Sequence, residues 1–331
     1  MTDSSQHARF GSGHAVRRVE DDSLLTGRGR FADNFSVDGQ AHVVFVRSPH
    51  AHARIAAIDA AAATAMPGVL AVVTGTDLVR AGVRPLVQSA DFKRADGAPP
   101  AAPPQHVLAV DAVRYVGEAV AAVVAATRTQ ARDAAESVDV RYEPLPAVAT
   151  IADAIAPGAP LVWPEAAGNV ACEKRHGDAK AAAKIFAGAA HVVTLDLEHQ
   201  RLAPCPIEPR STLAFVDGAT GRLTLRVSCQ TPTGLRDELA SEVLGVVPES
   251  VRVLVGDVGG GFGMKTALYA EDVVVAHCAR ALGRPVKWTA DRMEEFLAAS
   301  HGRDLASRAS LALDREGRML ALSVHSHANL G

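Results

Sequence analysis

The stretch Asp257-Val258-Gly259-Gly260-Gly261-Phe262-Gly263-Met264-Lys265 is the most informative part of this 331-residue chain. It follows a β-branched run at residues 251–255 and precedes an apolar segment with helical periodicity. Four glycines in five positions remove the Cβ atoms that would hold a ligand away from the backbone, and they permit dihedral angles closed to other residues. We therefore predict free peptide N–H groups at a helix start, with Lys265 as an added cation, an arrangement that favours an anionic, phosphate-bearing group.

Two common nucleotide motifs fail in this loop because of their spacing. A P-loop requires glycine immediately before Lys265-Thr266, and Met264 stands there. The dinucleotide motif Gly-x-Gly-x-x-Gly fails because its third glycine falls on Met264 when counted from Gly259, and on Thr266 when counted from Gly261. A tight glycine turn without a ligand stays open as an alternative.

Composition limits the classes of protein that this chain can represent. With 48% apolar and 21% charged residues it has the content of a globular protein, and its length allows two domains or one large one. A net charge of -3 and 4% aromatic residues argue against a nucleic-acid surface. Apolar runs stay shorter than the roughly 18 residues of a membrane span, and Met1–Phe10 lacks an apolar signal region. These features predict no membrane contact and a cytoplasmic location.

Metal-binding patterns are not evident in the sequence. The four cysteines are far apart and form no Cys-x-x-Cys pair, so we expect small buried residues rather than disulfides, zinc or iron–sulfur ligands. They are Cys172, Cys205, Cys229 and Cys278. The pairs His50/His52 and His325/His327 each share a strand face, but no carboxylate or cysteine accompanies them in sequence. We predict no metal held by side chains.

Hydrophobic periodicity predicts an α/β (α+β mixed) fold. The expected strands are residues 41–47, 53–58, 69–74, 118–126, 138–142, 191–197, 211–216, 222–228, 251–255, 285–289, 307–313 and 320–326. The expected helices are 59–65, 129–137, 233–244 and 269–282. Residues 91–104 form a predicted surface loop, and the proline-rich segment 147–169 a linker between domains at 20–146 and 170–331. Because a strand lies close to the last residue, we expect a sheet that this chain leaves unfinished.

Eight motifs in order resemble one family. They are Leu24-Leu25-Thr26-Gly27-Arg28-Gly29-Arg30-Phe31, Arg47-Ser48-Pro49-His50-Ala51-His52-Ala53, Arg114-Tyr115-Val116-Gly117-Glu118, Tyr142-Glu143-Pro144-Leu145-Pro146, Ile207-Glu208-Pro209-Arg210, Gln230-Thr231-Pro232, the glycine loop and Gly283-Arg284-Pro285-Val286-Lys287-Trp288. From about Gly27 to Gly331 the chain resembles the molybdenum-cofactor-bearing large subunit of the xanthine dehydrogenase, aldehyde oxidase and carbon monoxide dehydrogenase family. The resemblance implies an α/β hammerhead domain followed by the first, incomplete molybdopterin-binding domain.

The resemblance gives the glycine loop a specific role. It implies that backbone amides of the loop meet the oxo ligands of molybdenum and the pterin, and that the Gln230 side chain donates to an oxo ligand. The implied cofactor-binding residues are Gln230, Gly259, Gly260, Gly261, Phe262 and Gly263. The implied cofactor is molybdenum–molybdopterin in its cytosine dinucleotide form. Judged from the residues alone, a solvated turn glutamine is the favoured interpretation of Gln230, and the resemblance reverses that preference.

The implied reaction is the oxidative hydroxylation of an aldehyde or N-heterocycle, with electrons passing to iron–sulfur clusters and FAD on partner subunits. Purine-oxidising members carry glutamate where this chain has Thr266, which argues against a purine. The family's general-base glutamate lies beyond the part that this chain resembles, so we expect no catalytic base here. Glu271 is the nearest carboxylate, and we expect it to be a surface or helix-capping residue.

This chain should therefore be inactive alone and require a partner that carries the C-terminal molybdopterin-binding half. Either it is one piece of a split subunit or its gene is truncated. Two other hypotheses stay open: a non-catalytic assembly or remnant chain that keeps the fold, and an unrelated nucleotide-binding α/β enzyme.

Overall fold

The computed structural model describes residues 17–87 and 92–330, so the expectation for Met1–Phe10 lies outside the described residues. The strands of the first half are β1 (Ala41–Arg47), β2 (Ala53–Asp59), β3 (Val69–Thr74), β4 (Ala112–Val113), β5 (Ala119–Ala125) and β6 (Asp139–Pro144). Those of the second half are β7 (His191–Leu202), β8 (Ser211–Val216), β9 (Leu223–Val227), β10 (Val251–Leu254), β11 (Val286–Thr289), β12 (Gly302–Leu313) and β13 (Met319–Ala328). The α-helices are α1 (Asp21–Leu25), α2 (Ala61–Thr64), α3 (Gly75–Arg80), α4 (Arg128–Ala135), α5 (Ile151–Ala154), α6 (Ala179–Gly188), α7 (Pro232–Asp237), α8 (Ala270–Leu282) and α9 (Arg292–Ala298).

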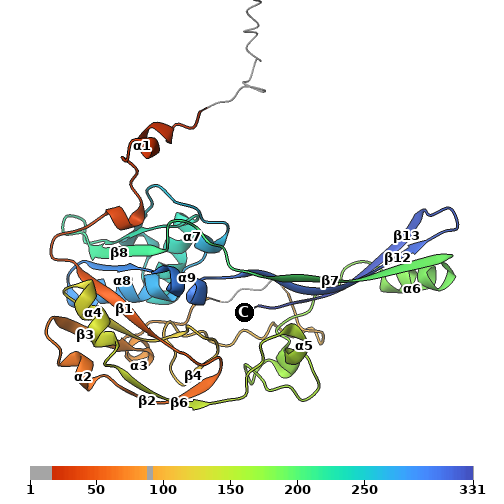
Figure 1. The fold of residues 1–331 in the computed structure, drawn as a ribbon, viewed down its shortest axis with the longest axis horizontal. Coiled ribbons are helices and arrows are strands. Elements are labelled where there is room, and N and C mark those ends of the chain that lie inside the picture. Colours follow the sequence, from red (N-terminus) through yellow and green to blue (C-terminus); the bar gives the residue numbers. More distant parts are fainter. Residues whose placement is uncertain (1–16, 88–91, 331) are drawn as a thin grey trace, which may run out of the picture.

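One seven-stranded mixed sheet forms the body of the molecule, in the order β10-β9-β8-β11-β1-β5-β3 (Figure 1). Strands β1, β3 and β5 come from the first half of the sequence and the other four from the second. The parallel pair of β1 with β11, where Ala41 faces Val286, joins the two sets. The two halves thus share one hydrogen-bonded sheet across the predicted linker, and the division at residues 147–169 stays a prediction.

Strand β5 lies at the centre of the core. All seven of its residues are buried, as its uninterrupted apolar sequence predicts. Its residues Ala122 and Val124 pack in the main core cluster, which includes the apolar side of α8. On its other face Val120 packs against Ala53 of the small sheet β4-β2-β6. The α/β prediction is confirmed, and this double cover explains why β5 carries no polar residue.

The two helices predicted in the second half each end at a glycine in the left-handed conformation, as their sequences predict. Helix α8 begins at Ala270, where the Tyr269 N–H donates to Asp272, and ends at Gly283 with φ of 60°. The helix predicted at 233–244 is wrong in one respect. Only α7 is α-helical, and Glu238–Leu244 continue as a π-helix that ends at Gly245. The wider turns bury Leu239, Ala240 and Val243 together.

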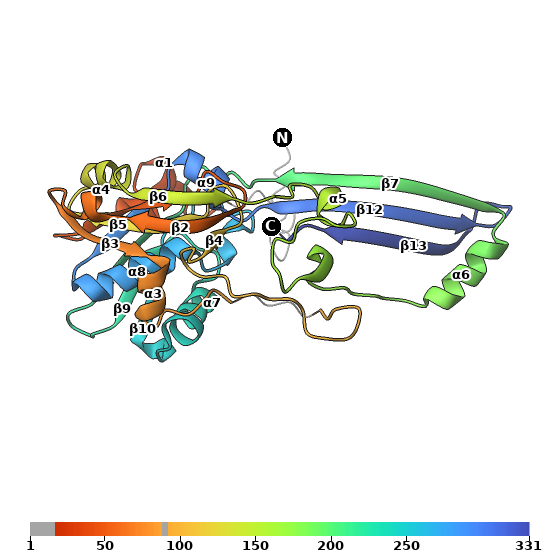
Figure 2. The ribbon, with the colours of Figure 1, turned by 90° about the horizontal axis from the view of Figure 1, so that it is seen from below.

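Strands β7, β12 and β13 form a separate antiparallel sheet that projects from the body as a long arm (Figures 1 and 2). Helix α6 accompanies the far end of this arm. The strands predicted at 191–197, 307–313 and 320–326 are confirmed, and each extends further than predicted. The additional residues at the strand ends pair with neighbouring strands of the sheet. The hydrophobic pattern of one strand does not reveal such partners.

The cysteines differ from expectation. Cys229 and Cys278 are buried, but Cys172 is half-buried and Cys205 is exposed in a proline-punctuated loop. Proline removes backbone donors and prevents regular pairing, so this loop stays at the surface. In the described part of the chain, no helix combines the length and apolar character needed to cross a bilayer.

Candidate functional site

The glycine loop at residues 259–263 follows β10 and has a backbone that only small residues adopt easily. Gly260 and Gly263 have φ of 100° and 86°, and Phe262 has φ of 50°. A Cβ on Gly261 would lie 2.5 Å from Cδ of Gln230, and a Cβ on Gly259 would lie 2.5 Å from Cβ of Glu208. Glycine is thus required here both by conformation and by the close approach of two side chains.

Three consecutive amides at the apex of the loop are available to a ligand. Among the described residues, the N–H groups of Gly260, Gly261 and Phe262 have no acceptor, whereas those of Gly259 and Gly263 donate to Glu208 and Gln230. Successive N–H groups in such turns form concave sites for anions. This part of the sequence prediction, free loop amides, agrees with the structure.

Gln230 lies against this loop and is held there by three hydrogen bonds. Its backbone N–H donates to the Lys265 carbonyl at 2.8 Å, and its side-chain Oε1 accepts from the N–H groups of Gly263 at 3.1 Å and Lys265 at 3.3 Å. Because the oxygen is held, the orientation of the amide is set. Its Nε2 donates to no described residue and the side chain is exposed. A fixed donor therefore stands beside the three free amides.

The predicted role of Lys265 as a ligand-facing cation is wrong. Its side chain is fully buried, and Nζ donates to Oε2 of Glu208 at 3.0 Å, to the Glu208 carbonyl at 2.8 Å and to Oγ of Ser228 at 2.8 Å. Burial lowers the pKa of Lys265, although its hydrogen bond to Glu208 opposes this. The charge faces inward because a buried ammonium requires a carboxylate partner, and Glu208 supplies it.

Glu208 organises the loop. Besides Lys265, its Oε2 accepts from the Gly259 N–H at 2.8 Å and from Ser228 Oγ at 2.6 Å, and its Oε1 accepts from the Ala32 N–H at 3.2 Å. Three distant segments therefore meet at one carboxylate. The sequence analysis missed this role, although Glu208 stands in a motif that carried the resemblance. The signal in the sequence was a charged residue, Glu208, placed between the apolar Ile207 and Pro209, a position that suggests a buried carboxylate.

The loop does not begin a helix, contrary to prediction. A short 3₁₀ turn at Met264–Thr266 follows it, and α8 starts only at Ala270. The Tyr269 hydroxyl stabilises this turn by donating a hydrogen bond to the Met264 carbonyl at 2.6 Å. The helix macrodipole acts over one turn, so the loop amides themselves account for the affinity for anions.

A buried ion-pair network lies beneath the site and includes Glu271, which is neither a surface nor a capping residue as predicted. Glu271 pairs with Arg47 at 2.6 Å and Arg210 at 3.0 Å. Arg210 also pairs with Glu295 at 2.8 Å, and Arg47 with Glu294 at 2.6 Å. Burial raises the pKa of Glu271, but the two guanidinium groups outweigh burial and hold it at about 2. A carboxylate so firmly ionised and enclosed cannot serve as a base for a bound substrate.

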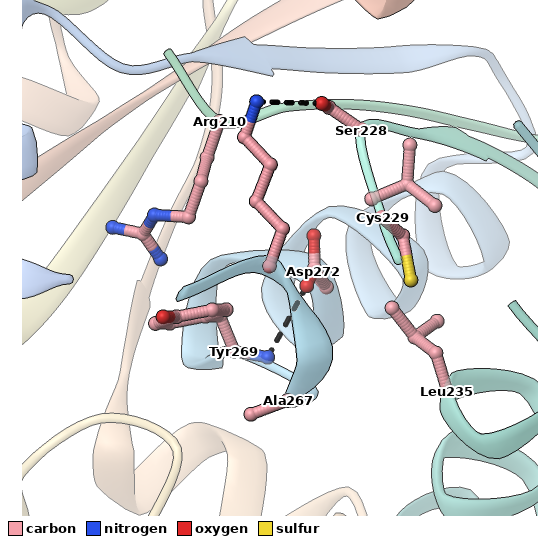
Figure 3. Close-up of a pocket in the computed structure, with 9 residues that line it drawn as sticks. Arg210, Ser228, Cys229, Leu235, Ala267, Tyr269 and Asp272 are labelled. Carbon is pink, nitrogen blue, oxygen red and sulfur yellow. Dashed lines mark hydrogen bonds between the residues drawn. The ribbon is translucent and has the colours of Figure 1, made fainter. Parts of the chain in front are cut away.

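Beside this network is a small pocket of about 10 Å³, enough for about one water molecule (Figure 3). Arg210, Lys265, Tyr269 and Asp272 are among its lining residues. Burial raises the pKa of Asp272 to about 6, against the hydrogen bond from Thr212. The pocket is too small for an organic substrate, so the open surface at the glycine loop is the candidate site.

Comparison with known families agrees with this geometry. Residues 162–331 match the molybdopterin cofactor-binding domain, and residues 26–146 match the aldehyde oxidase and xanthine dehydrogenase a/b hammerhead domain. The nicotine 6-hydroxylase large subunit of Paenarthrobacter nicotinovorans is 38% identical, over 95% of this chain and 37% of the relative. The carbon monoxide dehydrogenase large chain of Afipia carboxidovorans is 35% identical, over 97% of this chain and 40% of the relative.

Solved structures show the same similarity. Quinoline 2-oxidoreductase from Pseudomonas putida 86 superposes with a TM-score of 0.82 at 37% identity, over 94% of this chain and 38% of that one. Carbon monoxide dehydrogenase from Oligotropha carboxidovorans superposes with a TM-score of 0.83 at 34% identity, over 95% of this chain and 39% of that one. The chain thus spans about two fifths of the length of these relatives.

Proposed function

Because this chain belongs to the xanthine dehydrogenase and aldehyde oxidase family of molybdenum hydroxylases, we propose that it supplies one wall of a molybdenum–molybdopterin site. The observation that carries the proposal is the row of three free amides beside a fixed glutamine donor. The match of residues 162–331 to a molybdopterin cofactor-binding domain supports it.

The residues present fit an oxygen-rich anionic cofactor. The amides of Gly260, Gly261 and Phe262 offer hydrogen bonds to oxygen ligands, and Nε2 of Gln230 adds a side-chain donor. Gly259 and Gly263 shape the loop through their hydrogen bonds to Glu208 and Gln230. A Cβ on Gly263 would meet nothing within 4 Å, so the space beside this position is open. In this arrangement each donor is oriented before any ligand arrives.

When bound, the cofactor supplies the oxidative hydroxylation, and the chain's own residues bind and orient it. Relatives named for nicotine and quinoline favour an N-heterocycle, and an aldehyde is the other substrate class. The cofactor is proposed to be the cytosine dinucleotide form. Iron–sulfur clusters and FAD would reside on separate partner subunits, since the relatives are named as subunits of larger assemblies.

The general base is proposed to come from outside this chain. Glu271 is excluded by its two arginine partners. Because the chain spans about two fifths of its relatives, a polypeptide with the remaining molybdopterin-binding half would complete the site. We also propose a cytoplasmic location and separate domains at residues 20–146 and 170–331, joined by a linker at 147–169.

The test is to measure molybdenum per chain after purification alone and together with its neighbouring gene products. We expect molybdenum only in the complex. Gln230→Ala and Gly261→Val should each remove most of it, because the first deletes a donor and the second drives a side chain into Gln230. Gly218→Val is the matched control, since a Cβ there meets nothing within 4 Å.

Absence of molybdenum from every wild-type complex would refute the proposal and favour a non-catalytic assembly chain. Full molybdenum content and activity in both loop variants would instead remove the residue assignment.

A further inference from the structure

Helix α9 lies in the body of the molecule, close to where the arm joins it (Figures 1 and 2). The preceding residue, Asp291, caps the helix by accepting from the Glu294 N–H at 2.8 Å. With 7 residues, α9 is shorter than the roughly 12–15 residues at which isolated helices become marginally stable. It is therefore held by contacts with segments that are distant in sequence. The side chains that make these contacts are Arg292, Glu294, Glu295 and Leu297.

Residues 203–210 connect β7 to β8 without regular secondary structure, and Arg292 of α9 holds the first half of this connection. Arg292 donates from Nη2 to the Pro206 carbonyl at 2.7 Å and to the Ile207 carbonyl at 3.0 Å. Its Nη1 donates to Sγ of Cys205 at 3.4 Å. Hydrogen bonds from a charged donor are stronger than neutral ones, and the planar guanidinium presents several donors in a fixed geometry.

A buried ion pair holds the second half of the connection. Nε of Arg210 donates to Oε1 of Glu295 at 2.8 Å, and the two side chains are 5% and 2% exposed. The Arg210 carbonyl accepts from the Ala290 N–H at 3.0 Å, just before α9. Three of the eight residues at 203–210 are prolines, which have no N–H to donate. The conformation of this connection therefore depends on α9.

Between these two attachment points the connection contacts the glycine loop. Glu208 accepts from the Gly259 N–H at 2.8 Å, and its own N–H donates to the Gly259 carbonyl at 3.2 Å. A Cβ on Gly260 would lie 3.2 Å from Cβ of Pro206. Gly259 and Gly260 thus lie directly against residues that α9 holds. A shift of residues 203–210 would therefore move the loop amides.

The other contacts of α9 fix it to the first half of the chain. Glu294 pairs with Arg47 of β1 at 2.6 Å. Leu297 packs against Gly117, where a Cβ would lie 2.7 Å from Cβ of Leu297. Arg47 also donates to the Gly117 carbonyl at 3.0 Å. Because β1 belongs to the central sheet, α9 has a rigid support that does not include the glycine loop.

We propose that α9 positions the glycine loop, and that Arg292 is a positioning residue for the cofactor site. Arg292 acts through Pro206 and Glu208 rather than by touching a ligand. Donors at a binding site have to be held to within about 0.5 Å, which requires support from the residues behind them. The consequence for the cofactor rests on the proposed function, whereas the effect of Arg292 on the loop does not.

The test measures backbone hydrogen exchange of the full chain by mass spectrometry, resolved to single amides by fragmentation. Arg292→Met removes the guanidinium and keeps an unbranched side chain. The amides of Glu208 and Gly259, which bond to each other's residue, should exchange roughly tenfold faster than in the wild type. The amides of β5 should keep their protection, because this strand lies in the core. This restriction to the loop and its support distinguishes lost positioning from lost global stability.

Two further variants control the measurement. Arg308→Met makes the same substitution at an arginine that is 70% exposed on the arm, and it should change none of these exchange rates. Arg292→Lys keeps the charge but loses the planar fork, so it should accelerate exchange at Glu208 and Gly259 by about threefold. If Arg292→Met also lowers protection in β5, the comparison of Arg292→Lys with the wild type decides the question.

Unchanged exchange at Glu208 and Gly259 in both Arg292 variants would overturn the positioning proposal. An equal acceleration in Arg308→Met would also overturn it. Molybdenum per chain, measured in the assembled complex of each variant, should fall in Arg292→Met and stay at the wild-type level in Arg308→Met. Full molybdenum content in a variant whose loop exchanges faster would remove the role of Arg292 in the cofactor site.

The two proposals fail in different ways. A wild-type complex without molybdenum refutes the proposed function, and faster loop exchange in Arg292→Met would still show that α9 positions the loop. A complex that loses molybdenum in Gln230→Ala, but keeps both molybdenum and slow loop exchange in Arg292→Met, does the reverse.

Discussion

Replacing Glu208 by glutamine tests whether one buried carboxylate holds the glycine loop in place. Its Oε2 accepts from the Gly259 N–H, Ser228 Oγ and Lys265 Nζ within 3.0 Å. Glutamine keeps the size of the side chain but removes the charge, and Lys265, which is fully buried, loses its ionic partner. Breaking a buried pair by removing one charge costs about 3–5 kcal/mol. In this variant Lys265 retains two neutral acceptors, the Glu208 carbonyl and Ser228. We therefore expect Glu208→Gln to lower the free energy of unfolding by about 3 kcal/mol, the lower end of this range.

A double-mutant cycle separates this pair from general damage to the loop. Lys265→Met should alone cost about 3 kcal/mol, because it leaves Glu208 charged in a largely buried position. The double variant removes both charges, so its cost should be about 4 kcal/mol rather than the sum of about 6. The coupling energy is then about 2 kcal/mol.

Urea unfolding followed by the fluorescence of buried Trp288 measures these costs. The same variants should lose molybdenum in the assembled complex, since Glu208 fixes Gly259. If each single variant lost less than about 1 kcal/mol of unfolding free energy and the two losses were additive, the reasoning would be refuted, because removing one member of a buried, coupled ion pair costs more than that. Exposed Asp196→Asn is a control that removes a surface ion pair and should change stability by less than about 1 kcal/mol.

Three further predictions concern ionisable side chains. The stabilisation from Glu271 should be complete above pH 4.5 and lost as pH falls toward its folded pKa of about 2, so Glu271→Gln should flatten acid unfolding in that window while lowering stability at pH 7. Asp272 has the opposite effect, because burial raises its pKa to about 6. Its contribution to folding stability is therefore present below pH 3.8 and lost as pH rises through 6. Asp272→Asn should reduce the fall in melting temperature between pH 4 and 7. Cys205 is exposed, whereas Cys278 is buried and burial raises its pKa to about 12. A thiol reagent should therefore label Cys205 rapidly in the folded chain and Cys278 only after unfolding. Equal labelling rates for the two cysteines in the folded chain would contradict the structure.

Local sequence was a good guide wherever local physics decides the conformation. Strands β1, β3 and β8 occupy the predicted residues because alternating or continuous apolar runs need no distant partner to be recognised. Helix α8 ends at Gly283 for the same reason, since a left-handed residue is a local requirement. The free amides of the glycine loop also follow from the sequence, because four glycines in five positions permit backbone dihedral angles that regular strands and helices do not use.

The charged residues were predicted poorly. Lys265 and Glu271 were expected at a ligand and at the surface, and both are buried in ion pairs. Whether a charge faces solvent depends on a partner that lies elsewhere in the chain, here Glu208 and Arg210. Periodicity carries no information on such pairs, although all four residues stand in or near the motifs that resembled the family.

By itself, the sequence determined most of the strands, the glycine loop and the family, because these depend on the order of neighbouring residues. Only the tertiary structure decided that β1 and β11 close a single sheet across the predicted linker, and that Glu208 holds the loop from 51 positions away. It also decided that α9 holds the residues around Glu208, since Arg292 and Ile207 are 85 positions apart in the sequence. Each of these depends on contacts between distant segments, whose geometry follows from packing the whole chain and cannot be read from any one stretch of it.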